Sequence, residues 1–451
     1  MSALSKKYTQ QKIFKYVDSY LKLLKKKKIN ISNSSFCYLH NYGQLPGSAH
    51  LRLKFYGYRY LLKYLSIILK NIFTICKLKN FRLYNEKNLN NTYSNLIHSH
   101  VSKNNFNKDG SYSDIFFNIN SNKVKKTLFF LISEDNFIPK KLKKNIVIFA
   151  SSKPFFQLNI IYFFYVLCKT IIKLRFSLRK LLHEFSYISQ YSLKLNNEIN
   201  FIFKKYNFKF FLSLYEGQPY QNNLFYTLKK KYKKLKIHGY YHTGLLATHS
   251  SLYYRTGAPD KILISGNFQK NYLEKNLGWP KEKVQSIVSF RHKKERKVDF
   301  SGYIFLPMNF TEPQKILSGL EKYFKHSREK SLFTYKIRNH PYASNFKSHK
   351  KLIKKIILLM EKYKNKFNTK KNKTNSIFIG STTSLILAME HDVETVHICE
   401  DPFFDHYNYK IWDKFKTVKI SSNVYKHKLK PNQHILSLEY KYNNVRKYLK
   451  K

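Results

Sequence analysis

Cysteine is scarce in this sequence, and its few copies form no motif. Cys37, Cys76, Cys168 and Cys399 lie far apart and include no C-x-x-C pair. A disulfide framework and a cysteine-based zinc site both need closely grouped cysteines, so we expect neither. The opening segment "MSALSKKYTQQ" has no apolar core of the kind found in secretion signals. A reducing cytoplasm is therefore the expected location.

Long apolar runs are also missing. The most apolar stretch, "LNIIYFFYVLCKTIIKL" at 158–174, is interrupted by Lys169. A helix that spans a bilayer needs about 20 apolar residues. We therefore expect this stretch to be a buried helix or one that lies in a membrane interface, with burial favoured.

Acidic residues are few, with 26 Asp and Glu against 84 Lys and Arg, and the formal charge is +58. Such a charge attracts polyanions, either nucleic acid or an anionic membrane surface. However, Lys, Asn, Ile, Phe and Tyr are enriched together while Gly and Pro number only 13 and 11. An AT-rich coding sequence would give the same bias without selection for binding. Of the two partners we favour peripheral membrane contact, and nucleic acid is the weaker candidate.

Several signatures of enzyme sites are absent from the sequence. There is no G-x-x-x-x-G-K-[ST], no complete G-x-G-x-x-G after an apolar run, no H-E-x-x-H and no clear D-x-D motif. These absences argue against a P-loop NTPase, a typical dinucleotide enzyme and a zincin. We expect chemistry without a metal or a bound cofactor.

The apolar residues that are present form short runs typical of buried strands. From residue 126 onward, "KTLFFLIS", "NIVIFASS", "FKFFLSLYEG", "KIHGYYHTG" and "DKILISGNF" each end in a small or polar turn, and several precede helix-like segments. This alternation predicts an α/β fold with parallel sheets. The alternation of apolar runs and helix-like segments begins again after "RHKKERKVDFSG". We therefore expect two doubly wound, Rossmann-like domains that face a central cleft. The expected divisions are a basic N-terminal part at 1–120, a first α/β domain at 121–290, a linker at 291–302, a second α/β domain at 303–425 and a basic tail at 426–451.

A cluster of hydroxyl groups marks one junction in the second domain. In "FIGSTTSLILAM" an apolar run ends in a small turn and a helix-like pattern follows. Unpaired amide groups at such a strand-to-helix turn attract anions, and hydroxyls add donors for phosphate oxygens. The alternative is an ordinary N-cap, for which one hydroxyl suffices. The candidate phosphate ligands are Ser381, Thr382, Thr383 and Ser384.

A second candidate lies in "YKIRNHPYASN", where Arg338, His340 and Pro341 follow another predicted strand. A histidine at the carboxyl end of a strand can donate to a phosphate or assist a leaving group. The alternative is a plain surface turn. Asn309, at the end of "YIFLPMNF", is a further candidate for the cleft.

In the first half of the chain, Glu216 ends the run "FFLSLYEG". A carboxylate after a buried strand, facing a basic cleft, is a plausible general base. It could equally form a helix N-cap or an ion pair. His242 and Thr243 end the next predicted strand, and they are either polar groups of an acceptor site or part of a simple turn.

Taken together, the Glu-Gly, His-Pro and Ser/Thr motifs resemble those of bacterial GT-B glycosyltransferases that use CMP-activated sugars, such as sialyltransferases, polysialyltransferases and Kdo transferases. The runs "GAPDKILISGNFQKNYLEKNLGWPKEKV" and "IFIGSTTSLILAMEHDVETVHICEDP" are also similar to uncharacterised surface-carbohydrate biosynthesis proteins. The resemblance covers roughly residues 205–405. Tyr215 stands where the family pattern has a first acid, and Asp392 stands where it has a glycine.

The resemblance implies a role for each motif. Glu216 would be the base for the acceptor hydroxyl, His340 would bind the donor phosphate, and the turn at 381–384 would hold that phosphate. The implied function is transfer of a sugar, with a CMP-sugar favoured, to a glycan or lipid-linked acceptor. Two alternatives stay open: a polyol-phosphate transferase with a CDP-linked donor, and a nucleic-acid-binding protein without catalysis.

Overall fold

The computed structural model describes thirteen main segments of the chain and a few positions between them. These are residues 10–26, 48–62, 80–90, 92–133, 135–151, 187–248, 250–294, 302–310, 312–326, 335–340, 346–363, 375–441 and 444–449, with 65–66, 164–165, 168, 300 and 343. The apolar stretch at 158–174 lies almost wholly outside them. None of the helices in the described part of the chain has the length and apolarity that a bilayer crossing requires.

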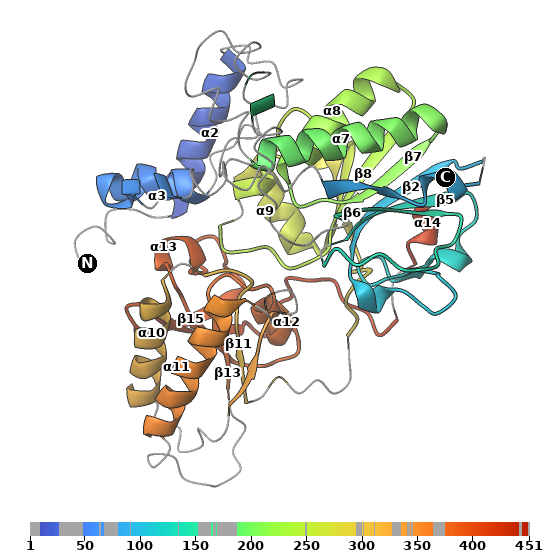
Figure 1. Cartoon of the computed structure of the whole chain (residues 1–451). Coiled ribbons are helices and arrows are strands. Elements are labelled where there is room, and N and C mark those ends of the chain that lie inside the picture. Colours follow the sequence, from blue (N-terminus) through green and yellow to red (C-terminus); the bar gives the residue numbers. More distant parts are fainter. Residues whose placement is uncertain are drawn as a thin grey trace.

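The fold is α/β, as the sequence predicts, and is built on two large sheets (Figure 1). The first sheet has eight strands in the order β1-β6-β5-β2-β7-β8-β9-β10. Only β1 runs antiparallel to its neighbour, β6, and every other pair of neighbours is parallel. The strands are β1 (Phe81–Tyr84), β2 (Asn95–Val101), β5 (Thr127–Ser133), β6 (Ile146–Ser151), β7 (Phe210–Leu214), β8 (Lys236–Tyr241), β9 (Lys261–Ser265) and β10 (Val284–Ile287).

The two faces of the first sheet are covered differently. Its central strands are buried on both faces, which explains why they are continuous apolar runs. One face packs against α7 (Tyr187–Lys205), α8 (Pro219–Lys231) and α9 (Asn267–Leu277). The other face packs against the segment 112–119, which includes β3 (Ser113–Asp114) and the start of β4 (Ile119–Asn120), and against the short helix α14 (Arg446–Leu449).

The second sheet has six strands in the order β12-β11-β13-β14-β16-β15. Its first four strands are parallel, and β16 and β15 add an antiparallel hairpin. Helices α10 (Pro313–His326) and α11 (Lys347–Tyr363) cover one face, and α12 (Ser384–Glu390) follows β13. The strands are β11 (Tyr303–Phe305), β12 (Lys336–Arg338), β13 (Ser376–Ile379), β14 (Thr395–Ile398), β15 (Phe415–Ser421) and β16 (Val424–Leu429). Strand β16 therefore runs through the domain boundary expected at 425.

Two N-terminal helices, α2 (Gln10–Lys26) and α3 (Ser48–Tyr56), pack against both sheet units. Phe14 of α2 contacts the rings of Tyr253 and Tyr272, with centroids 6.3 and 6.2 Å away. Tyr56 of α3 donates a hydrogen bond of 2.6 Å to Asp401, beside helix α13 (Pro402–Asp405). In Figure 1 the blue helix α3 lies next to α13, and the ring of Phe55 contacts that of Phe403. The sequence of the first 120 residues did not predict this packing.

The chain also returns from the second sheet to the first near its end. Glu390, at the end of α12, accepts hydrogen bonds from the amides of Ile435 and Leu436, at 2.5 and 2.8 Å. The next amide, that of Ser437, donates to the hydroxyl of Ser265 at the end of β9, at 3.0 Å. The segment 435–437 thus joins the two sheets before α14 packs on the first.

Candidate functional site

The strand order of the first sheet reverses between β2 and β7, where a crevice is expected at the carboxyl ends of the strands. From β2 the chain passes to β5 and β6 on one side, and it returns through α7 to β7 on the other side. In open α/β sheets, ligands bind outside the carboxyl ends of the strands at such a reversal. Glu216 lies two residues beyond the end of β7, so the sequence candidate is at this point of the fold.

The Glu216 carboxylate is half-buried and has two polar neighbours. Its Oε2 accepts a hydrogen bond of 3.0 Å from Gln218, and its Oε1 lies 3.8 Å from Nε2 of His242. The backbone amide of Glu216 donates to the side chain of Gln221, which also binds the carbonyl of Leu214. These contacts fix the loop and leave the carboxylate partly open to a ligand.

Gly217, the second residue of the Glu-Gly motif, is required by the backbone. Its φ is +69°, and a Cβ atom there would lie 2.0 Å from the carbonyl oxygen of Ser251. Only glycine tolerates both the left-handed conformation and this close approach. The carbonyl of Gly217 is in turn bound by Arg255, at 3.0 Å.

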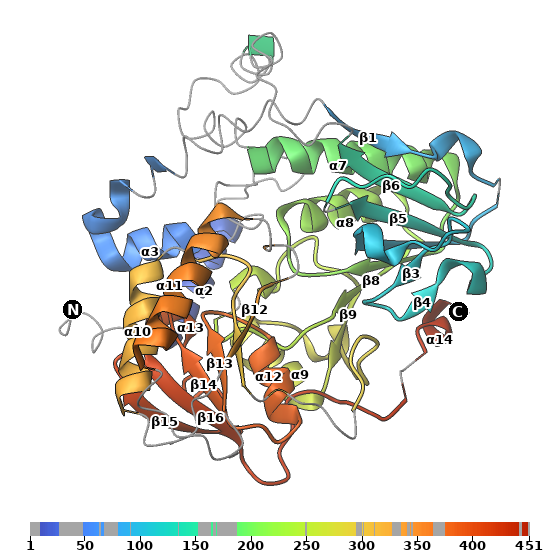
Figure 2. The ribbon, with the colours of Figure 1, turned by 60° about the horizontal axis from the view of Figure 1, so that its bottom comes forward.

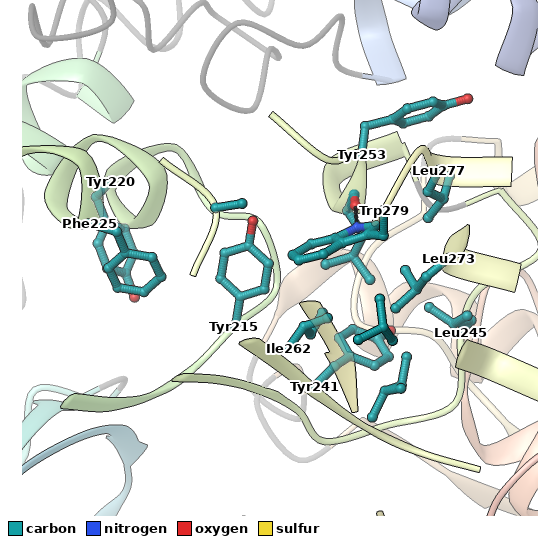
Figure 3. Close-up of a cluster of buried hydrophobic side chains, with 14 of the residues drawn as sticks. Tyr215, Tyr220, Phe225, Tyr241, Leu245, Tyr253, Ile262, Leu273, Leu277 and Trp279 are labelled. Atoms are coloured by element: carbon teal, nitrogen blue, oxygen red, sulfur yellow. Dashed lines mark hydrogen bonds between the residues drawn. The ribbon is translucent and has the colours of Figure 1, made fainter. Parts of the chain in front are cut away.

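Tyr215, which precedes Glu216, is a core residue. Its ring is fully buried between Phe225 and Trp279, with centroids 5.9 and 6.2 Å away (Figure 3). Its hydroxyl lies 3.3 Å from the side chain of Asn222. A carboxylate at this position would be buried among aromatic rings, so Glu216 is the acid that can reach the crevice.

His242 follows β8 and is buried beside Glu216. Burial, with a smaller effect of the nearby Arg291, holds the pKa of His242 well below its usual value. The ring is therefore neutral at pH 7, and its contact with Glu216 is not an ion pair. Its other side packs edge-on against Phe116, at 4.6 Å between centroids. Thr243, the next residue, is half-buried.

On the second sheet, the residues predicted to bind a phosphate lie at the same edge of the sheet. They follow strands that are not neighbours. Arg338 ends β12 and His340 follows it, whereas the turn at 380–384 follows β13. Strand β11 lies between them, and the exposed Asn309 follows β11. This edge is again a reversal point, because the chain passes from β11 to β12 and then crosses back to β13. Pro341 lies outside the described residues.

The individual environments of these residues differ. Arg338 is exposed, and its guanidinium carbon lies 5.7 Å from the centroid of the Phe305 ring. His340 is half-buried, and its amide donates to the side chain of Asn339 at 3.0 Å. Its carbonyl accepts from the amide of Ala343 at 2.9 Å, which makes a tight turn.

The hydroxyl-rich turn is held by a carboxylate that sequence reasoning did not identify. The hydroxyl of Ser381 donates a hydrogen bond of 2.6 Å to Asp405, and burial raises the pKa of Asp405 to about 6. The hydroxyl of Thr382 lies 3.4 Å from the amide of Ser384, and Thr383 makes no side-chain capping bond. Two of the four hydroxyls, those of Ser381 and Thr382, are therefore bonded within the protein.

The loop that follows β8 of the first sheet contacts α12, the helix that follows β13 of the second sheet. Gly244, in the loop after β8, approaches α12 so closely that a Cβ atom would lie 2.9 Å from the side chain of Ile386. Next to it, Tyr407 donates to the carbonyl of Leu245 at 3.5 Å. Gly244 is two residues from His242, and Ile386 is two residues from Ser384. Among the described residues, no hydrogen bond or ion pair joins Glu216 itself to the second sheet.

A buried histidine in the middle of β2 was also not identified from the sequence. His98 of β2 lies 2.9 Å from the hydroxyl of Ser213 of β7 through Nδ1, and 3.3 Å from the hydroxyl of Tyr220 through Nε2. Burial holds its pKa well below the usual value. The alternation of polar and apolar residues in "NLIHSHV" could have indicated that His98 lies in a strand. The acidic residues after the strand, in "CEDPFFD", could have indicated Asp405.

Within the described residues, no group of three or more His, Cys, Asp or Glu side chains is placed to hold a metal ion. Comparison with known proteins adds no assignment. No protein-family model matches the chain, and no curated protein matches its sequence.

Proposed function

We propose that this chain is a glycosyltransferase of the GT-B type, in which two α/β domains close on a nucleotide sugar and an acceptor. The contact between the loop after β8 and helix α12 is the observation that carries the proposal. The contact supports the proposal because Gly244 is two residues from His242 and Ile386 is two residues from Ser384. A transferase needs such a juxtaposition, because the acceptor oxygen must lie close to the anomeric carbon of the donor.

The second sheet would bind the donor. Arg338 and His340 would contact the phosphate of a nucleotide sugar, with Asn309 at the neighbouring strand end. The amides of Ser381 and Thr382 would add neutral donors to the phosphate oxygens. Charge that develops on the departing nucleotide is then stabilised by groups already in position. A CMP-linked sugar is the favoured donor, by the motif resemblance.

The first sheet would activate the acceptor. Glu216 would take the proton of an acceptor hydroxyl as its oxygen attacks the anomeric carbon, while the bond from that carbon to the phosphate oxygen breaks. The leaving nucleotide retains the bonding electron pair. The neutral His242 would position the carboxylate, and Thr243 would contact the acceptor. With its large positive charge, the protein would stay near an anionic membrane face, where a surface glycan or lipid-linked acceptor is assembled.

Calorimetry with CMP, CDP, UDP and GDP at moderate salt tests the donor site. We expect selective binding of cytidine nucleotides, and at least tenfold weaker binding by His340→Ala, because a charge-assisted contact is lost. His326→Ala is the matched control, since His326 is exposed at the end of α10. Failure of all four nucleotides to bind, or weak binding that salt abolishes equally in every protein, would rule out the proposal. Preference for CDP over CMP would favour the polyol-phosphate alternative.

A further inference from the structure

A pocket of about 460 Å³ lies outside the crevice, on the face of the first sheet that carries α14. In Figure 2, α14 lies next to β4 at the end of the chain. The segment 113–123 forms one side, and residues just before and within α14 form the other. The lining residues are Ser113, Asp114, Asn118, Ile119, Asn120, Lys123, Asn444 and Arg446.

Two cationic side chains, those of Lys123 and Arg446, line the pocket. Among the described residues, no carboxylate lies within ion-pair distance of Lys123 or Arg446. Asp114 also lines the pocket; it is buried, and its carboxylate accepts hydrogen bonds from the hydroxyl of Tyr112 and from the amides of Phe116 and Phe117. The lining thus has two cations against one carboxylate. The excess charge of the pocket is therefore positive.

Side-chain amides supply neutral hydrogen-bonding groups beside these cations. The oxygen of Asn444 accepts from the amide of Arg446 at 2.9 Å, which leaves its NH₂ group for a ligand. Asn118, at φ +48°, is exposed at the rim, and Asn120 is held to Ser113 at 3.0 Å. Cations next to amides suit a ligand that has both a negative group and several hydroxyls.

One short segment connects this pocket to the candidate catalytic pair. Asp114 lines the pocket, and its carboxylate binds the amide of Phe116 at 2.7 Å. The ring of Phe116 then packs against His242, which lies 3.8 Å from Glu216. Arg291 covers the same ring, at 4.9 Å from its centroid. A ligand in the pocket would thus lie close behind the residues that contact the acceptor hydroxyl.

We propose that the pocket binds an acidic sugar, held by its carboxylate or phosphate between Lys123 and Arg446 and by its hydroxyls at Asn118 and Asn444. Its assignment as a subsite for a distal sugar of the acceptor rests on the proposed transferase function. Binding of the acidic sugar itself does not depend on that function. The acceptor would then be an acidic glycan that extends from Glu216 past Phe116.

The test uses the full-length protein and four probes in calorimetry: sialyllactose, glucose 6-phosphate, lactose and inorganic phosphate. Sialyllactose and glucose 6-phosphate distinguish a carboxylate from a phosphate as the negative group. The pocket variant is the double change Lys123→Gln with Arg446→Gln. The control, Lys416→Gln with Lys428→Gln, removes the same charge from exposed positions on the β15–β16 hairpin. Thermal unfolding of both variants verifies that they fold.

We expect the wild-type protein to bind at least one acidic sugar ten times more tightly than lactose and inorganic phosphate. The pocket variant should lose at least tenfold in that affinity, whereas the control should not change. Equal binding by both variants, equal binding of lactose, or no binding of either acidic sugar would overturn the proposal. Binding of CMP and CDP is measured on the same samples. Binding of an acidic sugar without binding of a nucleotide would support the pocket and reject the transferase function. Binding of a nucleotide without binding of an acidic sugar would support the transferase function and reject the pocket.

Discussion

At the scale of single residues, the backbone explains which positions of the motifs cannot vary. The Glu-Gly motif needs its glycine because of the left-handed conformation and the approach of Ser251. The side chain of Tyr215 belongs to the core, which accounts for an aromatic residue rather than an acid at this position. The sequence predicted that Glu216 ends a strand, since the apolar run stops there. It could not predict the partner His242, because the spacing along the chain does not show which side chains meet across neighbouring strands.

Gly217→Ala should destabilise the fold strongly. The added methyl group meets both an unfavourable φ and the carbonyl of Ser251, so we expect a loss of about 2–3 kcal/mol or more in chemical denaturation. Gly278→Ala is the matched control, because Gly278 has the same φ of +69° and a Cβ atom there would meet no described atom within 4 Å. It should lose only about 1–2 kcal/mol. Equal losses in the two variants would show that the contact with Ser251 is unimportant.

Asp392→Gly should stabilise the protein. Asp392 follows α12 with φ +59°, a conformation that most residues other than glycine adopt at a cost. We expect a gain of up to about 1 kcal/mol in the free energy of unfolding, measured with denaturant. A loss of stability would mean that the Asp392 side chain has a structural role that its backbone does not reveal.

At the scale of elements, the sequence indicated the parallel strands and their order along the chain but not the pieces that join the two sheets. Runs such as 210–214 and 376–379 were recognisable because they are buried on both faces. The run "TVKISS" did indicate β15, whereas helices α2 and α3, the central strand β2 and strand β16 were not recognised. Their sequences mix polar and apolar residues, and contacts far away in the chain determine their positions.

Glu390→Ala tests the connection between α12 and the segment 435–437. Without the carboxylate, the buried amides of Ile435 and Leu436 lose their acceptor, which should cost about 2–4 kcal/mol. Hydrogen exchange should show lost protection at these two amides and retained protection in β2. His434→Ala is the control. His434 is mostly exposed, so its loss should cost less than about 1 kcal/mol. Unchanged exchange at 435 and 436 would contradict this account.

At the scale of the whole molecule, buried histidines should make the fold sensitive to acid. Burial lowers the pKa of His397 and His406 to about 4 and that of His292 to about 3. The unfolded chain takes up these protons near pH 6.5, so the stabilisation is complete above that pH and is lost as the pH falls toward 4. Asp405 has a raised pKa of about 6, so its uptake of a proton stabilises the fold as the pH falls from 6 to 3.8. The three histidines outnumber this one group, so the net effect of acid is a loss of stability.

We therefore expect the denaturant concentration at the unfolding midpoint to decrease as the pH is lowered from 7 to 5. His406→Phe keeps a ring against Tyr425, whose centroid is 4.0 Å away, and removes one titrating group. This variant should reduce the slope of unfolding free energy against pH by up to about 1.4 kcal/mol per pH unit between 4 and 6.5. An unchanged slope would show that His406 takes up its proton in the folded state as readily as in the unfolded chain.

The central claim is that Glu216 acts on an acceptor while the second sheet holds the donor. The most direct test is sugar transfer from a CMP-activated sugar by the Glu216→Gln variant, with nucleotide affinity measured in parallel. We predict that kcat falls by about 10² to 10⁴, because the general base is lost, while nucleotide binding stays within about twofold of wild type. Transfer at the wild-type rate by this variant would contradict the account.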